Sequence, residues 1–246
     1  MKHCFLFFSG LFWAAAVSAV ERPNIVIFYV DDLGWADTSV RMMESDPNSA
    51  SDFHQTPHLA ALAKRGMKFS NAYAPAPTCT PSRKSIQFGK TPGRLGYTFV
   101  HDVLALQRKL EWKDETSLAD VVKAADPNYI TAHFGKGMGN ERMETIGYDV
   151  TDELEPHGDN GNFHGDYISL KNRTKLPPDN PKRMASLRKS SVDFVNAHSG
   201  KRPFLMMVSH YAVHVPHAAR ADLIEKYRKL PRGKYLTDSD YLPVDE

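Results

Sequence analysis

Pro23-Asn24-Ile25-Val26-Ile27-Phe28-Tyr29-Val30 is a short, continuous apolar run rich in β-branched residues. This pattern is typical of a strand that is buried on both faces of a largely parallel sheet. Similar runs alternate along the chain with segments of helical character, and this alternation predicts an α/β fold with a mainly parallel central sheet flanked by helices. The further strands are expected at 67–73, 128–134 and 203–209, and the helices at 57–66, 80–89, 116–125, 181–198 and 218–230.

Capping signals and the spacing of apolar residues predict where some of these helices begin and which of their faces are buried. Thr56 is expected to be the N-cap of the 57–66 helix, with Pro57 at its first position, where a missing N–H costs nothing. Two helices should each bury one apolar face, and residues 138–180, rich in Gly, Asp, Asn and Pro, are predicted to form a long surface excursion over the sheet edge. The expected inward residues are Leu118, Val121 and Val122 in one helix and Leu187, Val192 and Val195 in the other.

Two adjacent carboxylates, Asp31 and Asp32, follow the first run directly. The carboxyl end of a strand is where open α/β sheets place their ligands. The two carboxylates repel each other unless they share a cation or hydrogen-bond donors, and a hard divalent ion is the natural partner. The alternative is a solvated turn before Gly34.

Cys79 lies in the turn Pro77-Thr78-Cys79-Thr80-Pro81-Ser82-Arg83. Pro81 suits the first position of a helix, which predicts that the thiol sits just before a helix N-terminus. Free backbone N–H groups there favour anions, and Arg83 adds a planar donor fork suited to sulfate or phosphate. The alternative is an inert, buried thiol.

Further polar residues follow two other predicted strands. Lys136 comes after the 128–134 run, and His210, His214 and His217 come after the 203–209 run. Taken singly, a lysine at such a place is often a solvated cation and a histidine often a structural residue. Their shared placement with Asp31-Asp32 and Cys79 at strand ends favours one common site.

Residues 1–19 have the pattern of a secretory signal peptide: a basic start, an apolar run and Val17-Ser18-Ala19 as a small-residue cleavage site. The apolar run is too short to span a membrane. We therefore expect a secreted or periplasmic protein with residues 20–246 as its mature part, in which Cys79 is the one cysteine. The formal net charge of +2, without a charged tail, disfavours nucleic acid and membrane surfaces as partners.

Five motifs in this order resemble the type I sulfatases of the alkaline phosphatase superfamily, across nearly the whole mature chain. They are Pro23-Asn24-Ile25-Val26 with Asp31-Asp32-Leu33-Gly34, Thr56-Pro57-His58-Leu59, Cys79-Thr80-Pro81-Ser82-Arg83, Ala132-His133-Phe134-Gly135-Lys136 and His214-Val215-Pro216-His217. The resemblance implies a sulfatase-like α/β fold and hydrolysis of a sulfate ester, with a sulfated small molecule or polysaccharide as substrate.

The resemblance also implies roles for individual residues. Asp31, Asp32 and Cys79 correspond to ligands of the family's calcium ion, with magnesium as the alternative metal. Cys79 corresponds to the cysteine that the formylglycine-generating enzyme oxidises to formylglycine, whose hydrate supplies the attacking oxygen, and Arg83 to the guanidinium that holds this hydrate. Lys136 corresponds to the lysine that bridges sulfate and nucleophile. His214 corresponds to the histidine beside the leaving-group oxygen, and His217 to a further substrate contact.

The chain departs from the family pattern in three places. Lys136-Gly137-Met138 stands where the family usually has Lys-Trp-His, and Ile86-Gln87-Phe88-Gly89-Lys90 replaces the common Leu-Thr-Gly-Arg segment. The later strand that completes the family's metal site has no match before Glu246, so we expect the N-terminal part of a longer enzyme, inactive by itself. Two alternatives remain: a phosphate or phosphonate ester hydrolase of the same superfamily, and a non-catalytic binding protein on a decayed sulfatase fold.

Overall fold

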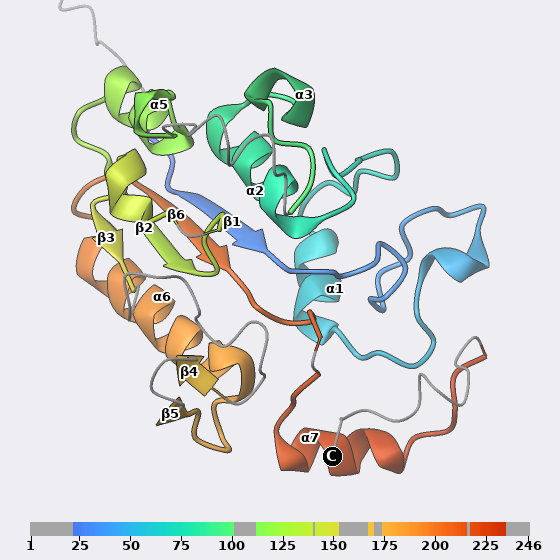
Figure 1. The fold of residues 1–246 in the computed structure, drawn as a ribbon. Coiled ribbons are helices and arrows are strands. Elements are labelled where there is room, and N and C mark those ends of the chain that lie inside the picture. Colours follow the sequence, from blue (N-terminus) through green and yellow to red (C-terminus); the bar gives the residue numbers. More distant parts are fainter. Residues whose placement is uncertain are drawn as a thin grey trace, which may run out of the picture.

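A four-stranded parallel sheet forms the centre of the chain (Figure 1). The computed structural model describes residues 22–100, 112–139, 141–152, 167–169, 174–215 and 217–234. The strand order is β1-β6-β2-β3, and every pairing is parallel. The strands are β1 (Ile25–Tyr29), β2 (Ile130–Gly135), β3 (Val150–Thr151) and β6 (Phe204–Ser209).

Helix α6 (Met184–His198) covers one face of the sheet (Figure 1). Leu187 and Phe194 of α6 are buried against the side chains that β2 and β6 send to this face. Phe194 meets the rings of Phe134 and Phe204 edge-on, at centroid distances of 5.8 and 5.4 Å. Tight aromatic and aliphatic packing therefore fixes β2 beside β6, the two strands that lead into the polar sheet edge described below.

The opposite face of the sheet is covered by α2 (Cys79–Phe88), α3 (Pro92–Leu95) and α5 (Leu118–Ala125) (Figure 1). Phe88 of α2 packs in one core with Leu205 of β6, and Ile25 and Ile27 of β1 line its border. Gly89 ends α2 in the left-handed conformation, with φ 59°, as a glycine after a helix commonly does. This packing anchors the last turn of α2, while its first turn reaches the carboxyl edge of the sheet.

The remaining described elements are short. They are α1 (Pro57–Ala63), α7 (Ala221–Arg228), the antiparallel pair β4 (Tyr167–Ser169) and β5 (Thr174–Lys175), and the 3-10 turns η1 (Pro47–Ser49), η2 (Trp112–Asp114), η3 (Met143–Ile146) and η4 (Pro181–Arg183). No helix in the described part of the chain has the length and apolarity needed to cross a bilayer. The proposed signal peptide at 1–19 and much of the predicted 138–180 excursion lie outside the described residues.

Two helices begin at residues that carry N-terminal sequence signals. Thr56 is the N-cap of α1 and Pro57 its first residue, although the Thr56 hydroxyl bonds Ser39 rather than its own helix. Ser117 and Asp120 form a full capping box at the start of α5. The capping box stabilises the start of α5 because it satisfies unpaired N–H groups of the first turn.

Several sequence-based expectations are wrong. Residues 67–73 form no strand, and their apolar side chains are exposed, Met67 to 77% and Phe69 to 65%. Strand β1 is not buried on both faces, because α6 covers β2 and β6 but leaves Val26 and Phe28 of the edge strand exposed to 52% and 59%. In the helices, Ala119 and Phe194 are buried, whereas the predicted inward residues Val121 and Val192 are 53% and 51% exposed.

Candidate active site at the carboxyl edge of the sheet

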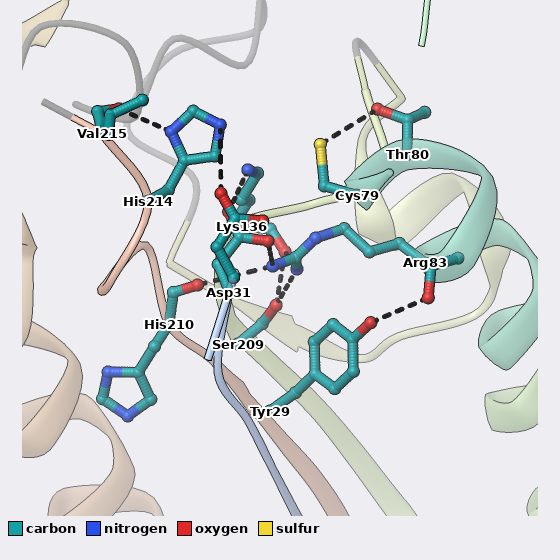
Figure 2. A network of polar contacts seen from close by, with 12 residues as sticks. Tyr29, Asp31, Cys79, Thr80, Arg83, Lys136, Ser209, His210, His214 and Val215 are labelled. Carbon is teal, nitrogen blue, oxygen red and sulfur yellow. Dashed lines mark hydrogen bonds and ion pairs between the residues drawn. The ribbon is translucent and has the colours of Figure 1, made fainter. Parts of the chain in front are cut away.

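The predicted polar residues meet at one edge of the sheet. Asp31 follows β1, Lys136 follows β2 and Ser209 ends β6, and these three strands are parallel neighbours. Their carboxyl ends therefore lie together, as the sequence predicts. Figure 2 shows the resulting network, with Arg83 entering it from α2.

Asp31 is the centre of this network and is 3% exposed. Its Oδ1 accepts a hydrogen bond from Arg83 Nη2 at 3.0 Å, and its Oδ2 accepts one from Lys136 Nζ. Burial opposes ionisation of this carboxyl group, but the positive charges of Arg83 and Lys136 outweigh it and hold the pKa of Asp31 below its ordinary value. Asp31 is thus an anion at neutral pH, held between two cations.

Arg83 is 2% exposed and fixes several parts of the site at once. Its Nη1 donates to the carbonyl oxygen of Lys136 at 2.8 Å and to the hydroxyl of Ser209. Its guanidinium lies over the ring of Tyr29, 4.9 Å from the centroid. The buried Nε of Arg83 has no hydrogen-bond partner among the described residues, so one charged donor remains available to a ligand.

Cys79 is the first residue of α2, one helical turn before Arg83 (Figure 2). Residues four apart lie on the same helix face, so the thiol and the guanidinium belong to one side of α2. The prediction that Cys79 precedes the helix and Pro81 opens it is wrong by two residues, because Thr78 is the N-cap. Proline fits anywhere in a first turn, since the N–H groups there have no helical partner.

The thiol of Cys79 is free and half-buried. Its Sγ lies 3.9 Å from the hydroxyl oxygen of Thr80. At the start of a ten-residue helix, Cys79 sits where backbone N–H groups and the helix dipole favour negative charge. A nucleophile at this position would face the cationic side of the network.

Asp31, Asp32 and His214 form the group of described residues that could hold a metal ion. One ligand atom from each lies within 4.8 Å of the others. His214 Nε2 lies 3.8 Å from Asp32 Oδ2, and Asp32 adopts the left-handed conformation with φ 56°, uncommon for a residue with a side chain. Such backbone strain clusters at functional sites.

The donor set fits a divalent cation in part. Two carboxylates are the oxygen ligands that calcium and magnesium prefer, whereas imidazole is more typical of transition metals. Calcium takes about six to eight oxygens, more than these residues supply, and both oxygens of Asp31 already accept from cations. Further ligands and a shift of Lys136 are therefore needed for full coordination.

Lys136 depends on the glycine before it. Gly135 has φ 97°, and a Cβ atom there would lie 2.0 Å from the carbonyl oxygen of Ser209. This close approach lets the Lys136 N–H donate to the same carbonyl at 2.8 Å. The side chain of Lys136 is 12% exposed and reaches Asp31, so the structure brings it into the network.

Sequence reasoning missed Ser209 and Tyr29. Ser209 is fully buried, donates to the Lys136 carbonyl at 2.6 Å and accepts from Arg83. Tyr29 bonds the hydroxyl of Ser82 on α2 at 3.1 Å. For both residues, the available signal in the sequence was a polar side chain at the end of a predicted strand. His217, in contrast, is exposed and belongs to none of the contacts described for the site.

The fold and the site define an α/β protein in which a free thiol at a helix start, the cations Arg83 and Lys136, and two adjacent carboxylates gather at one sheet edge. The chain belongs to the sulfatase family, whose model, described as Sulfatase, matches residues 23–236.

Arylsulfatase A of Bos taurus is 33% identical over 177 residues, which are 68% of this chain and 31% of that protein. N-acetylgalactosamine-6-sulfatase of Mus musculus is 37% identical over 82 residues, or 33% of this chain and 14% of that protein. The crystal structure of Ps i-CgsB superposes with a TM-score of 0.62 at 20% identity, covering 86% of this chain and 50% of that one. The chain thus spans about half or less of the relatives that it matches.

Proposed function

We propose that this protein hydrolyses sulfate esters, with residue 79 as the site of the nucleophile. The observation that carries the proposal is the convergence of Arg83 and Lys136 on the sheet edge beside the N-terminus of α2, where Cys79 lies. Membership of the sulfatase family supports it. The buried, unpartnered Nε of Arg83 fits an oxygen-bearing group near residue 79 better than an inert thiol.

Formylglycine at position 79 and a divalent cation held by Asp31, Asp32 and further ligands would supply an oxygen nucleophile and positive charge. The chain's own residues do the rest. Lys136, partly exposed, is placed to bind a sulfate oxygen. Arg83 holds the Lys136 backbone and the Asp31 carboxylate in position through its hydrogen bonds. His214, at the rim, is placed to give a proton to the departing alcohol oxygen.

A sulfated carbohydrate is the substrate class that the relatives favour. One matched relative is named N-acetylgalactosamine-6-sulfatase, and Ps i-CgsB has also been solved in complex with k-i-k-neocarrahexaose. The structure of this complex supports only the fold of the present chain, because the two sequences are 21% identical. We extend the carbohydrate assignment to this chain as part of the proposal, together with export from the cell and maturation by a formylglycine-generating enzyme.

Mass spectrometry of the peptide that contains Cys79 tests the proposal most directly. The full-length protein is produced together with a formylglycine-generating enzyme, and the expected product is the aldehyde at residue 79. Release of inorganic sulfate from an aryl sulfate is then measured, with Cys79→Ala as the inactive control. An unmodified thiol would exclude this mechanism, and release of phosphate from an aryl phosphate in place of sulfate would favour a phosphoester hydrolase.

A further inference from the structure

Lys84, directly after Arg83 on α2, is a buried cation outside the network described above. Its side chain is 1% exposed, and its Nζ pairs with Glu141 Oε1 at 2.8 Å. The same ammonium lies 3.9 Å from the ring centroid of Trp112 and 5.0 Å from that of Tyr97. A carboxylate and two aromatic faces therefore enclose one lysine.

Placing an ammonium group here is energetically expensive. Burial lowers the pKa of Lys84, and the Glu141 carboxylate only opposes this effect. An apolar side chain of the same length would fill the space between Trp112 and Tyr97 without that cost, since buried ion pairs often stabilise less than hydrophobic replacements. Packing alone therefore does not explain a charged residue at position 84. The charge of Lys84 can, however, fix the position of Glu141 through their ion pair.

Glu141 ends the segment that begins with Lys136. Met138 of this segment is fully buried in the core, and a Cβ atom on Gly137 would lie 3.5 Å from the Glu141 carbonyl oxygen. Gly139 has φ 122°, and a Cβ atom there would lie 2.9 Å from Glu141 Oε2 and 3.6 Å from Thr80 Cγ2. The segment therefore runs beside the first turn of α2, which carries Cys79.

Two successive cations of α2 thus hold the two ends of this segment. Arg83 binds the carbonyl oxygen of Lys136 at 2.8 Å, and Lys84 binds the carboxylate of Glu141. We propose that Lys84 and Glu141 are positioning residues, whose ion pair holds Glu141 and the described residues 136–139 against α2 and so sets where Lys136 lies relative to residue 79. The assignment of a catalytic role to that geometry rests on the proposed function.

Glu141→Gln tests the proposal, because it keeps the shape of the side chain and removes its charge. Glu115→Gln is the matched control, since Glu115 pairs with Lys90 at a partly exposed position just after the C-terminal end of α2. Hydrogen exchange is measured for the amides of residues 136–139 and, as a gauge of global stability, for those of β6. We expect exchange in the segment to rise about 10-fold or more in Glu141→Gln, with β6 and the control unchanged.

Steady-state kinetics on an aryl sulfate, with the full-length, formylglycine-bearing protein, supply the second readout. We expect kcat to fall about 10-fold in Glu141→Gln with KM within twofold, as misplacement of a reacting group costs rate rather than binding. Lys84→Met should give the same two changes, and the double variant no more than either single one. Unchanged exchange in the segment, or an exchange increase shared by β6, would overturn the proposal.

The two readouts separate this inference from the proposed function. Faster exchange confined to the segment supports the positioning of residues 136–139 even if the unchanged protein releases no sulfate, in which case the proposed function fails alone. Faster exchange with an unchanged kcat in an active enzyme would overturn the positioning role.

Discussion

Asp31 is the residue at which the charges of the site balance. Its carboxylate is 3% exposed and lies between Arg83 and Lys136. Replacing it by Asn would leave Arg83 and Lys136 without the anion that they share, and breaking a buried ion pair from one side typically costs about 3–5 kcal/mol. We expect Asp31→Asn to lower the free energy of unfolding by about 3 kcal/mol, measured by urea denaturation.

Asp32→Asn is the natural comparison, because Asp32 is adjacent and its side chain is 53% exposed. Substitution at such an exposed position usually changes stability by no more than about 0.5 kcal/mol. Equal effects of the two substitutions would contradict the central position of Asp31 in the charge network.

His133 gives the molecule a specific sensitivity to acid. The side chain is 1% exposed, and burial, with the nearby charge of Arg83, lowers its pKa from 6.5 to about 3. The unfolded chain therefore binds a proton at pH 5 that the folded chain does not. The contribution of His133 to stability is complete above pH 6.5 and is lost as the pH falls toward 3, with a slope of about 1.4 kcal/mol per pH unit.

His133→Leu should remove that slope while keeping an apolar group beside the ring of Tyr148. We expect the difference in unfolding free energy between pH 7 and pH 5 to be smaller in the variant by about 2 kcal/mol. Urea denaturation at the two pH values measures it. An equal difference in both proteins would mean that His133 is protonated within the fold.

Site residues could be predicted from the sequence where their type and their place at the end of an element were enough to bring them together. Asp31, Arg83 and Lys136 do meet, as their positions after a strand or at a helix start predict. The partnership of Lys84 with Glu141 could not be predicted, because it joins residues 57 positions apart through the fold. Contacts of that kind depend on the path of the chain after β2, which no local pattern encodes.

At the scale of elements, the end of β2 depends on a glycine. Gly135 combines φ 97° with the 2.0 Å approach of the Ser209 carbonyl to its missing Cβ. Gly135→Ala would force β2 and β6 apart where the site begins, so we expect a loss of at least about 2 kcal/mol in unfolding free energy. Thermal unfolding followed by circular dichroism measures this loss.

Gly93→Ala in α3 is the matched control for that substitution. A Cβ atom on Gly93 has no atom within 4 Å, and alanine favours a helix over glycine. We expect the midpoint temperature of thermal unfolding of Gly93→Ala to equal that of the unchanged protein or to exceed it. A Gly135→Ala protein as stable as Gly93→Ala would contradict the close contact between β2 and β6.

Elements were predictable where local chemistry and tertiary context agree. The strand β6, buried between helices, is a continuous apolar run over 204–208, whereas β2 alternates apolar residues with Thr131 and His133; both strands form where expected. Residues 67–73 also contain apolar and aromatic side chains but have no neighbouring strand in the described sheet, and an isolated segment cannot satisfy its backbone groups as a strand. Whether such a segment becomes a strand depends on a neighbouring strand to pair with, which the composition of the segment does not reveal.

At the scale of the whole molecule, one sheet face is unevenly covered. Val26 and Phe28 lie on the same side of β1 as Met206 and Val208 of β6, and α6 covers only the latter pair. Apolar side chains of an edge strand that face solvent bind hydrophobic dyes and favour association. This surface is the main apolar feature that the described sheet presents to water.

Val26→Thr/Phe28→Thr tests that property. Both side chains are more than half exposed, and threonine suits a strand, so we expect the unfolding free energy to change by no more than about 0.5 kcal/mol. Binding of the dye ANS should fall severalfold, because the adjacent apolar pair is gone. Val192→Thr, at a 51% exposed position on α6, should leave the dye signal unchanged. A similar fall in both variants would show that the dye responds to general surface polarity and not to the uncovered face of β1.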